Sequence, residues 1–301
     1  MKRDTNNENR AGLIAAVLAQ TLWGLLPVYW KWMADLAPYQ ILVHRVVWSF
    51  VFLQIVLFTR GKNHVRALLR DPTHRKTSLA GGVLVSINWL LYIWSVNTGR
   101  ILEASLGYYI MPLLTGAFGL LLGETFSRRQ GIAFGFAAVG VLVQMVALGR
   151  FPVFALILAL VFAGYTVVKK KSPLNAMDSL YAETLCVLPF ALLYLVYGEW
   201  HGSGITGNLP QAYWLRAATT GVITAVPLLL YGYGVQRIPL RVTAFAQYLN
   251  PTISLLLGVL LYKETFSTLR FVSFLIIWIG VVLFTADRLQ SGRAARRRLR
   301  E

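Results

Sequence analysis

Charge is scarce in this chain. Of its 301 residues only 14% are Asp, Glu, Lys or Arg, whereas 56% are hydrophobic. A soluble domain carries roughly 25% charged residues, so this chain has too few charges to cover a water-facing surface. Apolar blocks recur instead, and each approaches the roughly 20 residues that a helix needs to cross the hydrocarbon core. The composition predicts an integral membrane protein with no soluble domain.

Cysteine is nearly absent, since Cys186 is the only one. An intrachain disulfide and a cysteine metal cluster are therefore excluded. The four histidines, His44, His64, His74 and His201, are scattered and show no metal-binding spacing. No nucleophile, acid–base pair or metal set gathers at one face, so the pattern argues against an enzyme. We expect no cofactor and no bound metal.

The apolar blocks predict an all-α integral membrane protein with ten transmembrane helices. Residues 1–10 precede the first helix as a polar segment, and residues 287–301 follow the last as a basic tail. The first block is too long and bulky for a cleavable signal, so it is expected to stay as a helix. The predicted helices are 11–32, 38–59, 77–98, 103–123, 128–148, 151–169, 178–198, 213–236, 241–262 and 268–286.

Acidic residues are few, and the net charge is +17. Such an excess can indicate nucleic acid binding, but here the basic residues lie in loops between apolar blocks. With ten crossings, 22 of the 29 Lys and Arg residues fall on the side of the termini, six fall on the other side, and Arg45 lies inside a helix. The positive-inside rule then places both termini in the cytoplasm, at a bacterial inner membrane. Membrane lipids are the expected partners, and nucleic acid is not.

The sequence contains an internal duplication. The string ETFS occurs at Glu124–Ser127 and again at Glu264–Ser267, 140 residues later. The chain is therefore predicted to contain two five-helix units, residues 11–148 and 151–286. Because five is odd, the second unit enters the membrane from the opposite side, an arrangement typical of secondary transporters. Further matches at or next to this offset pair Gly24 with Gly164, Gly140 with Gly280, and Pro112 with Pro251.

The repeated unit, which ends its fourth helix with Gly-Glu-Thr or Lys-Glu-Thr, resembles the EamA domain of the drug/metabolite transporter superfamily. Four strings are similar to the RarD branch, also called chloramphenicol-sensitive proteins. The resemblance covers essentially the whole chain and implies a permease without naming its cargo. Met111 stands where Asn is expected before the proline, which argues against a substrate hydrogen bond there. The strings are HRVVWS at 44–49, NWLLYIW at 88–94, EASLGYY at 103–109, and Gln247-Tyr248 before Pro251-Thr252.

Together, the inverted repeats and the resemblance predict a transporter that works by alternating access at a central cavity between the repeats. Its small-molecule substrate is expected to be an amphipathic metabolite, an amino-acid-like solute or a drug. Export is implied by the resemblance alone. A channel and a lipid-handling protein are the alternatives, and the sequence does not decide between monomer and homodimer.

Ionisable residues inside membrane helices are costly and are candidates for function. Arg45 can bind an anionic group such as a carboxylate through its guanidinium, or it can pair with Glu103 and join two helices. His44 and Glu183, which match at an offset of 139, are candidates for proton coupling. Glu124 and Glu264 are expected to be structural, in contact with backbone or basic groups at helix ends.

Aromatic and amide side chains near mid-helix supply the remaining candidates, whereas Trp30 fits an interfacial anchor. Prolines at corresponding places in the two halves indicate helix breaks beside a transport site. The predicted substrate-binding residues are Arg45, Asn88, Trp89, Tyr92, Tyr109, Gln247, Tyr248 and Asn250. The predicted helix-break or gating residues are Pro27, Pro112, Pro227 and Pro251.

Overall fold

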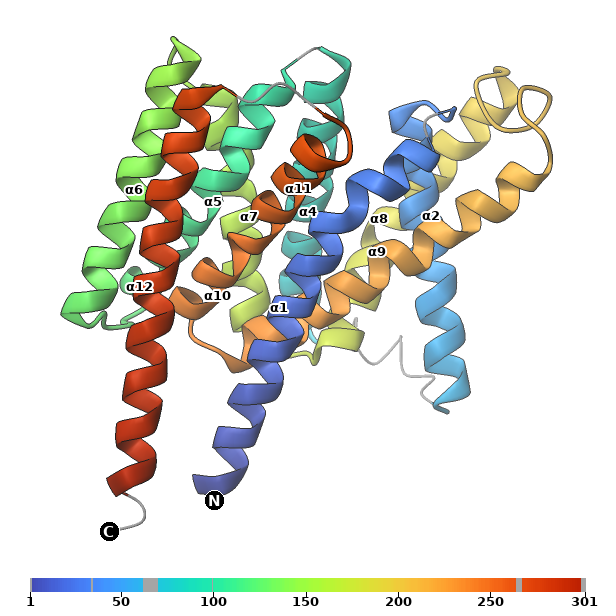
Figure 1. Cartoon of the computed structure of the whole chain (residues 1–301). Coiled ribbons are helices and arrows are strands. Elements are labelled where there is room, and N and C mark those ends of the chain that lie inside the picture. Colours follow the sequence, from blue (N-terminus) through green and yellow to red (C-terminus); the bar gives the residue numbers. More distant parts are fainter. Residues whose placement is uncertain (1, 34, 62–69, 99, 264–266, 299–301) are drawn as a thin grey trace.

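The computed structural model describes residues 2–33, 35–61, 70–98, 100–263 and 267–298, and the described chain is all helical (Figure 1). Residues 62–69 and 264–266, which include the predicted structural residue Glu264, lie outside the described residues. The helices are α1 (Lys2–Trp32), α2 (Pro38–Thr59), α4 (Pro72–Asn97), α5 (Ile101–Leu121), α6 (Arg128–Leu148), α7 (Val153–Lys171), α8 (Ala176–Trp200), α9 (Ala212–Arg237), α10 (Leu240–Gln247), α11 (Leu249–Leu260) and α12 (Thr268–Arg298).

The predicted all-helical membrane architecture is confirmed. Among the described residues, nine segments are long and apolar enough to cross a membrane, with α10 and α11 together forming one of them. Helix α4 adds a further segment of 26 residues, which is about 39 Å long at 1.5 Å per residue. The two chain ends lie at the same end of the bundle (Figure 1), as an even number of crossings requires.

Helices α1 and α12 run beyond the apolar blocks that predicted them. Helix α1 starts at Lys2, and α12 continues to Arg298. Hydropathy marks only the stretch that lipid surrounds, whereas helical hydrogen bonding continues through polar residues that form helices well. The polar N-terminal segment and much of the basic tail are therefore helical extensions of membrane segments.

The two repeats pack mainly against each other. Helix α1 packs on α9 and α11 of the second repeat, and its repeat partner α7 packs on α4 and α5 of the first. In the same way α2 packs on α9, and α8 packs on α4. Three further pairs, α2 with α8, α5 with α10, and α6 with α12, join helices that occupy the same place in the two repeats. This pattern of matched contacts is that of a two-fold axis between inverted units.

The first ETFS string fastens one repeat to the other. The Glu124 carboxylate accepts hydrogen bonds from the backbone N–H groups of Leu240 (2.6 Å) and Arg241 (3.0 Å), which open α10. The N-terminus of a helix has unpaired N–H groups and a positive dipole end, so a carboxylate stabilises it. The predicted structural role of Glu124 is confirmed.

Ser127 ends the same string and begins α6. Its hydroxyl accepts from the Gln130 backbone, and the Gln130 side chain accepts from the Ser127 backbone, which forms a capping box. The carboxylate of Asp287 on α12 then accepts from the side chains of Ser127 (3.0 Å) and Gln130 (2.9 Å). One four-residue string thus caps α10 of the second repeat, starts α6 of the first repeat, and links α6 to α12 of the second.

Helix α4 also begins at a side-chain cap. The Asp71 carboxylate accepts hydrogen bonds from the backbone N–H groups of Thr73 (2.7 Å) and His74 (3.3 Å). These bonds, the one from Thr73 first, hold the pKa of Asp71 below its usual value. The cap lies outside the membrane-spanning segments and favours the start of α4 at this point.

The prolines affect their helices in different ways. Helices α1, α5 and α9 contain Pro27, Pro112 and Pro227 in their interiors and are continuous. The corresponding segment of the second repeat divides at Tyr248, between α10 and α11, three residues before Pro251. Pro112 and Pro251 occupy matching places, but the helix is divided only in the second repeat, near Pro251.

Helices α6 and α12 approach most closely at glycines. The Ser273 hydroxyl donates to the Gly140 carbonyl (2.8 Å). A Cβ added at Gly140 would lie 2.6 Å from Ile277 Cγ1 and 2.8 Å from the Ser273 carbonyl oxygen. By contrast, a Cβ added at Gly131 or Gly135 would meet nothing within 4 Å. Of these three α6 glycines, Gly140 is the one in tight contact.

Replacement of Gly140 by Ala is expected to destabilise the protein by about 1–3 kcal/mol, because the added methyl overpacks a close helix contact. Gly135→Ala is the matched control, since it adds the same methyl to the same helix in open space and gains helix propensity. Thermal unfolding in detergent measures both variants. Equal midpoints for the two would contradict the close contact between α6 and α12.

Candidate functional site: a cavity between the repeats

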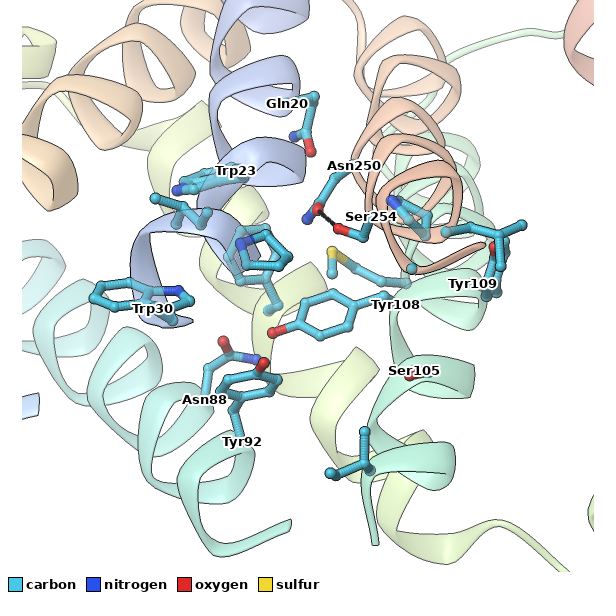
Figure 2. A pocket seen from close by; sticks show the side chains of 18 of the residues that line it. Gln20, Trp23, Trp30, Asn88, Tyr92, Ser105, Tyr108, Tyr109, Asn250 and Ser254 are labelled. Carbon is cyan, nitrogen blue, oxygen red and sulfur yellow. Dashed lines mark hydrogen bonds between the residues drawn. The ribbon is translucent and has the colours of Figure 1, made fainter. Parts of the chain in front are cut away.

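A cavity of about 700 Å³ lies between the two repeats. The first repeat lines it with side chains from α1, α2, α4, α5 and α6, and the second repeat lines it with side chains from α7, α9, α11 and α12. Figure 2 shows several of these side chains around the cavity. Several lining residues stand at helix ends away from the chain termini, including Lys31 at the end of α1 and Ile101 at the start of α5. Lys31 and Ile101 are both exposed, so the mouth of the cavity lies at that end of the bundle.

Arg45 lies at the cavity wall between two indoles. Its guanidinium carbon is 4.9 Å from the ring centroid of Trp30 and 4.5 Å from that of Trp89. Its Nε donates to the Thr224 hydroxyl at 3.0 Å. Such stacking stabilises a cation that is partly removed from water.

The pairing of Arg45 with Glu103 that the sequence left open does not occur. Glu103 forms its ion pair with Arg150, at the junction of α6 and α7. No carboxylate forms an ion pair with Arg45 among the described residues. This leaves a cation in the cavity wall whose partners in the described protein are neutral.

The wall opposite α1 combines aromatic rings with an amide. Tyr92 and Tyr108 meet edge to face with their centroids 6.0 Å apart. In Figure 2 the Tyr108 ring reaches toward Asn88 and Tyr92. The Asn88 amide nitrogen donates to the Leu158 carbonyl at 3.3 Å, so its carbonyl oxygen is left as an acceptor.

Aromatic rings close the inner end of the cavity. Trp23 contacts Phe162 (centroids 5.9 Å apart) and Tyr231 (5.2 Å). Behind them the Tyr231 hydroxyl hydrogen-bonds Thr166 (2.6 Å) and accepts from the Gln247 amide (2.8 Å). We call these five residues the floor. The hydroxyls of Thr166 and Tyr231 and the amide nitrogen of Gln247 bond to one another, which lowers the cost of burying them. The Gln247 carbonyl oxygen is buried without a hydrogen-bond partner among the described residues.

One turn further along α7 lies a fully buried ion pair. Lys169 Nζ is 2.7 Å from Glu183 Oε1, and the two side chains are 0% and 1% exposed. The Glu183 carboxylate also accepts from Ser179 (2.9 Å) and Tyr165 (3.2 Å). This cluster joins α7 to α8 on the side of the floor away from the cavity mouth.

The structure brings most of the predicted binding residues together. Those that line the cavity are Arg45, Asn88, Trp89, Tyr92, Tyr109 and Asn250, together with Pro27 and Pro251. Asn250 lies on α11, where its side-chain oxygen is 3.5 Å from the Ser254 hydroxyl (Figure 2). The residues do come from both repeats, as a site between inverted units requires.

Gln247 and Tyr248 do not line the cavity, contrary to their predicted role in binding. Helix α10 packs against α5 and α1, which holds Gln247 in the floor and buries Tyr248 against Phe245, with centroids 6.1 Å apart. Pro112 and Pro227 are likewise absent from the lining. The division of the helix at Tyr248 changes which side chains face the cavity.

The two candidates for proton coupling also lie off the cavity. Glu183 belongs to the ion pair behind the floor. His44 is fully buried with its ring edge-on to Trp214, 5.5 Å between centroids, and neither ring nitrogen has a hydrogen-bond partner among the described residues. The two positions match in the repeats but lie in different chemical surroundings.

Comparison with known proteins identifies the fold and family. The model of the EamA-like transporter family matches residues 10–146 and 151–286. The chain belongs to this family. Its members are transporters, so the chain is not an enzyme.

Full-length relatives support the assignment. The uncharacterized transporter YojE of Bacillus subtilis is 40% identical over 296 residues, covering 96% of this chain and 98% of that protein. Protein RarD of Escherichia coli is 36% identical over 288 residues, covering 95% and 97% respectively. A solved crystal structure with 18% sequence identity has a TM-score of 0.69 and covers 90% of this chain and 96% of that one, which shows a shared fold.

Sequence reasoning missed part of the wall on α1. Trp30 was expected to anchor at the membrane interface, yet it stacks on Arg45 inside the cavity. A usable signal was present, because Gln20, Trp23, Pro27 and Trp30 recur every three or four residues and so share one helix face. All four line the cavity.

Cysteine labelling can test the cavity mouth. Ser105 lines the cavity and is exposed, whereas Ser179 is 2% exposed. In a Cys186→Ser background, Ser105→Cys is expected to react with a water-soluble maleimide at least about tenfold faster than Ser179→Cys, because a thiol reacts in its solvated thiolate form. Mass spectrometry of the purified protein measures both rates, and an unreactive Ser105→Cys would contradict an open mouth.

Proposed function

We propose that this protein is an inner-membrane secondary transporter that moves small amphipathic metabolites, amino-acid-like solutes or drugs by alternating access. One observation carries the proposal: a 700 Å³ cavity between the two repeats has a mouth at one end and a packed floor at the other. Side chains from both repeats line it, so movement of one repeat against the other would change which end is open.

A continuous pore fits these contacts less well than a transporter does. The floor brings together three aromatic rings in mutual contact, with a hydrogen-bonded layer and then the Lys169–Glu183 pair behind it. A solute in the cavity would have to displace all of these groups to continue inward. Alternating access provides for that displacement as a global change of state.

The Lys169–Glu183 pair serves in this proposal as the inner latch. The pair joins α7 to α8 while the outer mouth is open. In the proposed cycle, Lys169 and Glu183 move apart when the inner end opens. Protonation of Glu183 would remove the charge that holds Lys169, so the latch can couple a proton to the transport cycle. We favour Glu183 over His44 for this role, because Glu183 lies in the layer that has to open.

We also propose that both termini lie in the cytoplasm, as the 22-to-6 distribution of basic residues favours. The cavity mouth, at the opposite end of the bundle, then faces the outside of the membrane. The Ser105→Cys variant reports this orientation in intact cells. A membrane-impermeant maleimide that labels it in micelles but never from outside cells would contradict the orientation.

Counterflow in proteoliposomes tests the transport function directly. Vesicles that contain the protein and an unlabelled solute are expected to accumulate the labelled solute transiently, whereas protein-free vesicles do not. A panel of amino acids, small aromatic metabolites and chloramphenicol covers the proposed substrates; a Pseudomonas aeruginosa relative, 28% identical, is named chloramphenicol-sensitive protein RarD. Runs with and without a pH gradient separate proton coupling from facilitated diffusion. If the vesicles contain folded protein and exchange no solute of the panel, the proposal is contradicted.

The inner latch yields a stability prediction. Lys169→Met should lower the free energy of unfolding by about 3–5 kcal/mol, because it leaves the Glu183 charge buried and unpaired. Adding Glu183→Gln should restore most of this loss, since the uncompensated charge is removed. Denaturation in detergent measures both variants and their parent.

The same double variant tests the latch as part of the inner closure. Thr166 in the floor is 0% exposed, so a Thr166→Cys thiol is expected to be unreactive in the parent and to become reactive once the latch is removed. Retained burial of this thiol in a stable double variant would show that the pair is a structural link only.

A further inference from the structure

We propose that the cavity selects organic anions, specifically a flat apolar or aromatic body that carries one carboxylate, and that Arg45 binds this carboxylate. The inference rests on the proposed transport function and narrows its substrate class. It comes from the charges that line the cavity and from the groups that leave Arg45 without a partner.

Every charged residue that lines the described cavity is basic. Lys31, Arg45 and Arg270 contribute to the wall, and no Asp or Glu does so within the described residues. Lys31 Nζ lies 3.9 Å from the centroid of Tyr262. Cations gathered around a cavity produce a positive potential that attracts anions and opposes cations.

Arg45 has donors to spare. A guanidinium carries five N–H groups in a planar fork, and the described protein engages one of them, Nε, through Thr224. The indoles of Trp30 and Trp89 have their ring centroids 4.9 and 4.5 Å from its central carbon, and no described residue hydrogen-bonds the edge formed by its two terminal nitrogens. That edge matches the two oxygens of a carboxylate, which an arginine binds through two parallel hydrogen bonds.

The surroundings explain why such a cation is tolerated. An ionised side chain within the membrane is costly and usually pairs with an opposite charge. Here Glu103, the carboxylate that the sequence suggested as a partner for Arg45, forms its ion pair with Arg150. Stacking and one neutral hydrogen bond offset part of the cost, and an arriving anion supplies the missing charge.

The remaining wall favours a flat body and discriminates against an amine. Trp23, Tyr92 and Tyr108 present rings to the cavity (Figure 2), and a cavity of this size suits a small amphipathic ligand. An ammonium group would find only neutral acceptors, such as the Asn88 carbonyl oxygen, beside three cations. We therefore expect the cavity to bind a carboxylate that has no amino group more tightly than an amino acid, and an amino acid more tightly than an amine that has no carboxylate.

Three probes with one phenyl ring and differing charge test the selectivity: 3-phenylpropionate, phenylalanine and phenethylamine. Binding to the full-length protein in detergent is measured by quenching of tryptophan fluorescence. Because hydrogen bonds to a charged group are stronger than those between neutral groups, 3-phenylpropionate should bind at least about tenfold more tightly than phenethylamine. Phenethylamine binding as tightly as the anion would overturn the proposal.

Variants assign the selectivity to Arg45. Arg45→Gln should remove the tighter binding of 3-phenylpropionate relative to phenethylamine. Arg45→Lys should lower the affinity for 3-phenylpropionate, which should still bind more tightly than phenethylamine. The matched control is Arg216→Gln, because Arg216 also stacks on two rings, Trp32 and Tyr213, but does not line the cavity. It should leave the preference unchanged. An Arg45→Gln protein that unfolds at the parental temperature and retains the preference would overturn the assignment. If that variant does not fold, Arg45→Lys provides the test. An Arg45→Lys protein that binds 3-phenylpropionate with the parental affinity would also overturn the assignment.

Counterflow with the same three probes separates this inference from the transport proposal. Exchange of the phenyl compounds without regard to charge would overturn the anion selectivity and leave transport in place. Selective binding of 3-phenylpropionate without exchange would support the anion site and contradict transport. Exchange of 3-phenylpropionate in preference to the other two would support both.

Discussion

Inside hydrocarbon, a polar group must find its partner within the protein, because no water is present to replace it. This constraint explains many of the contacts that hold this bundle together. Glu124 caps a helix of the other repeat, Asp287 gathers two donors from α6, and Glu183 accepts from three side chains. Most of these polar contacts join two helices, so satisfying the groups also fixes the packing.

The same constraint makes the two repeats depend on each other. Helix α1 packs on α9 and α11, and α7 packs on α4 and α5, so the first helix of each repeat is seated largely in the other. A single repeat would expose the interfaces that α6 and α12 bury at their glycines. Because the matched pairs face each other across an axis, the proposed alternating access would change the two ends of the cavity in opposite senses through a small shift of one repeat.

Much of this architecture follows from periodicity and composition. Hydropathy gives the membrane segments, and the spacing of ETFS gives the inverted repeat, because both depend on the average character of many residues. The details of the site depend instead on the phase of single helices. Trp30 enters the cavity because it shares a face with Trp23, and Gln247 leaves it because its segment divides at Tyr248. Pro251 indicates a disturbed helix, but the sequence does not predict the direction in which the side chains of the preceding turn will point.

The repeats share a fold, yet their chemistry differs at matching positions, and this difference gives the cavity its direction. His44 in α2 corresponds to Glu183 in α8, where the carboxylate pairs with Lys169 behind the floor. The residue after His44 is Arg45, which finds indoles and a hydroxyl but no carboxylate among the described residues. One end therefore carries a neutralised pair that can be buried, and the other carries a cation that resists burial. Closure of the outer mouth around Arg45 would remove its charge from water at a cost, and a bound carboxylate lowers that cost. Recognition of an anion and closure of the outer mouth are, on this argument, one electrostatic event.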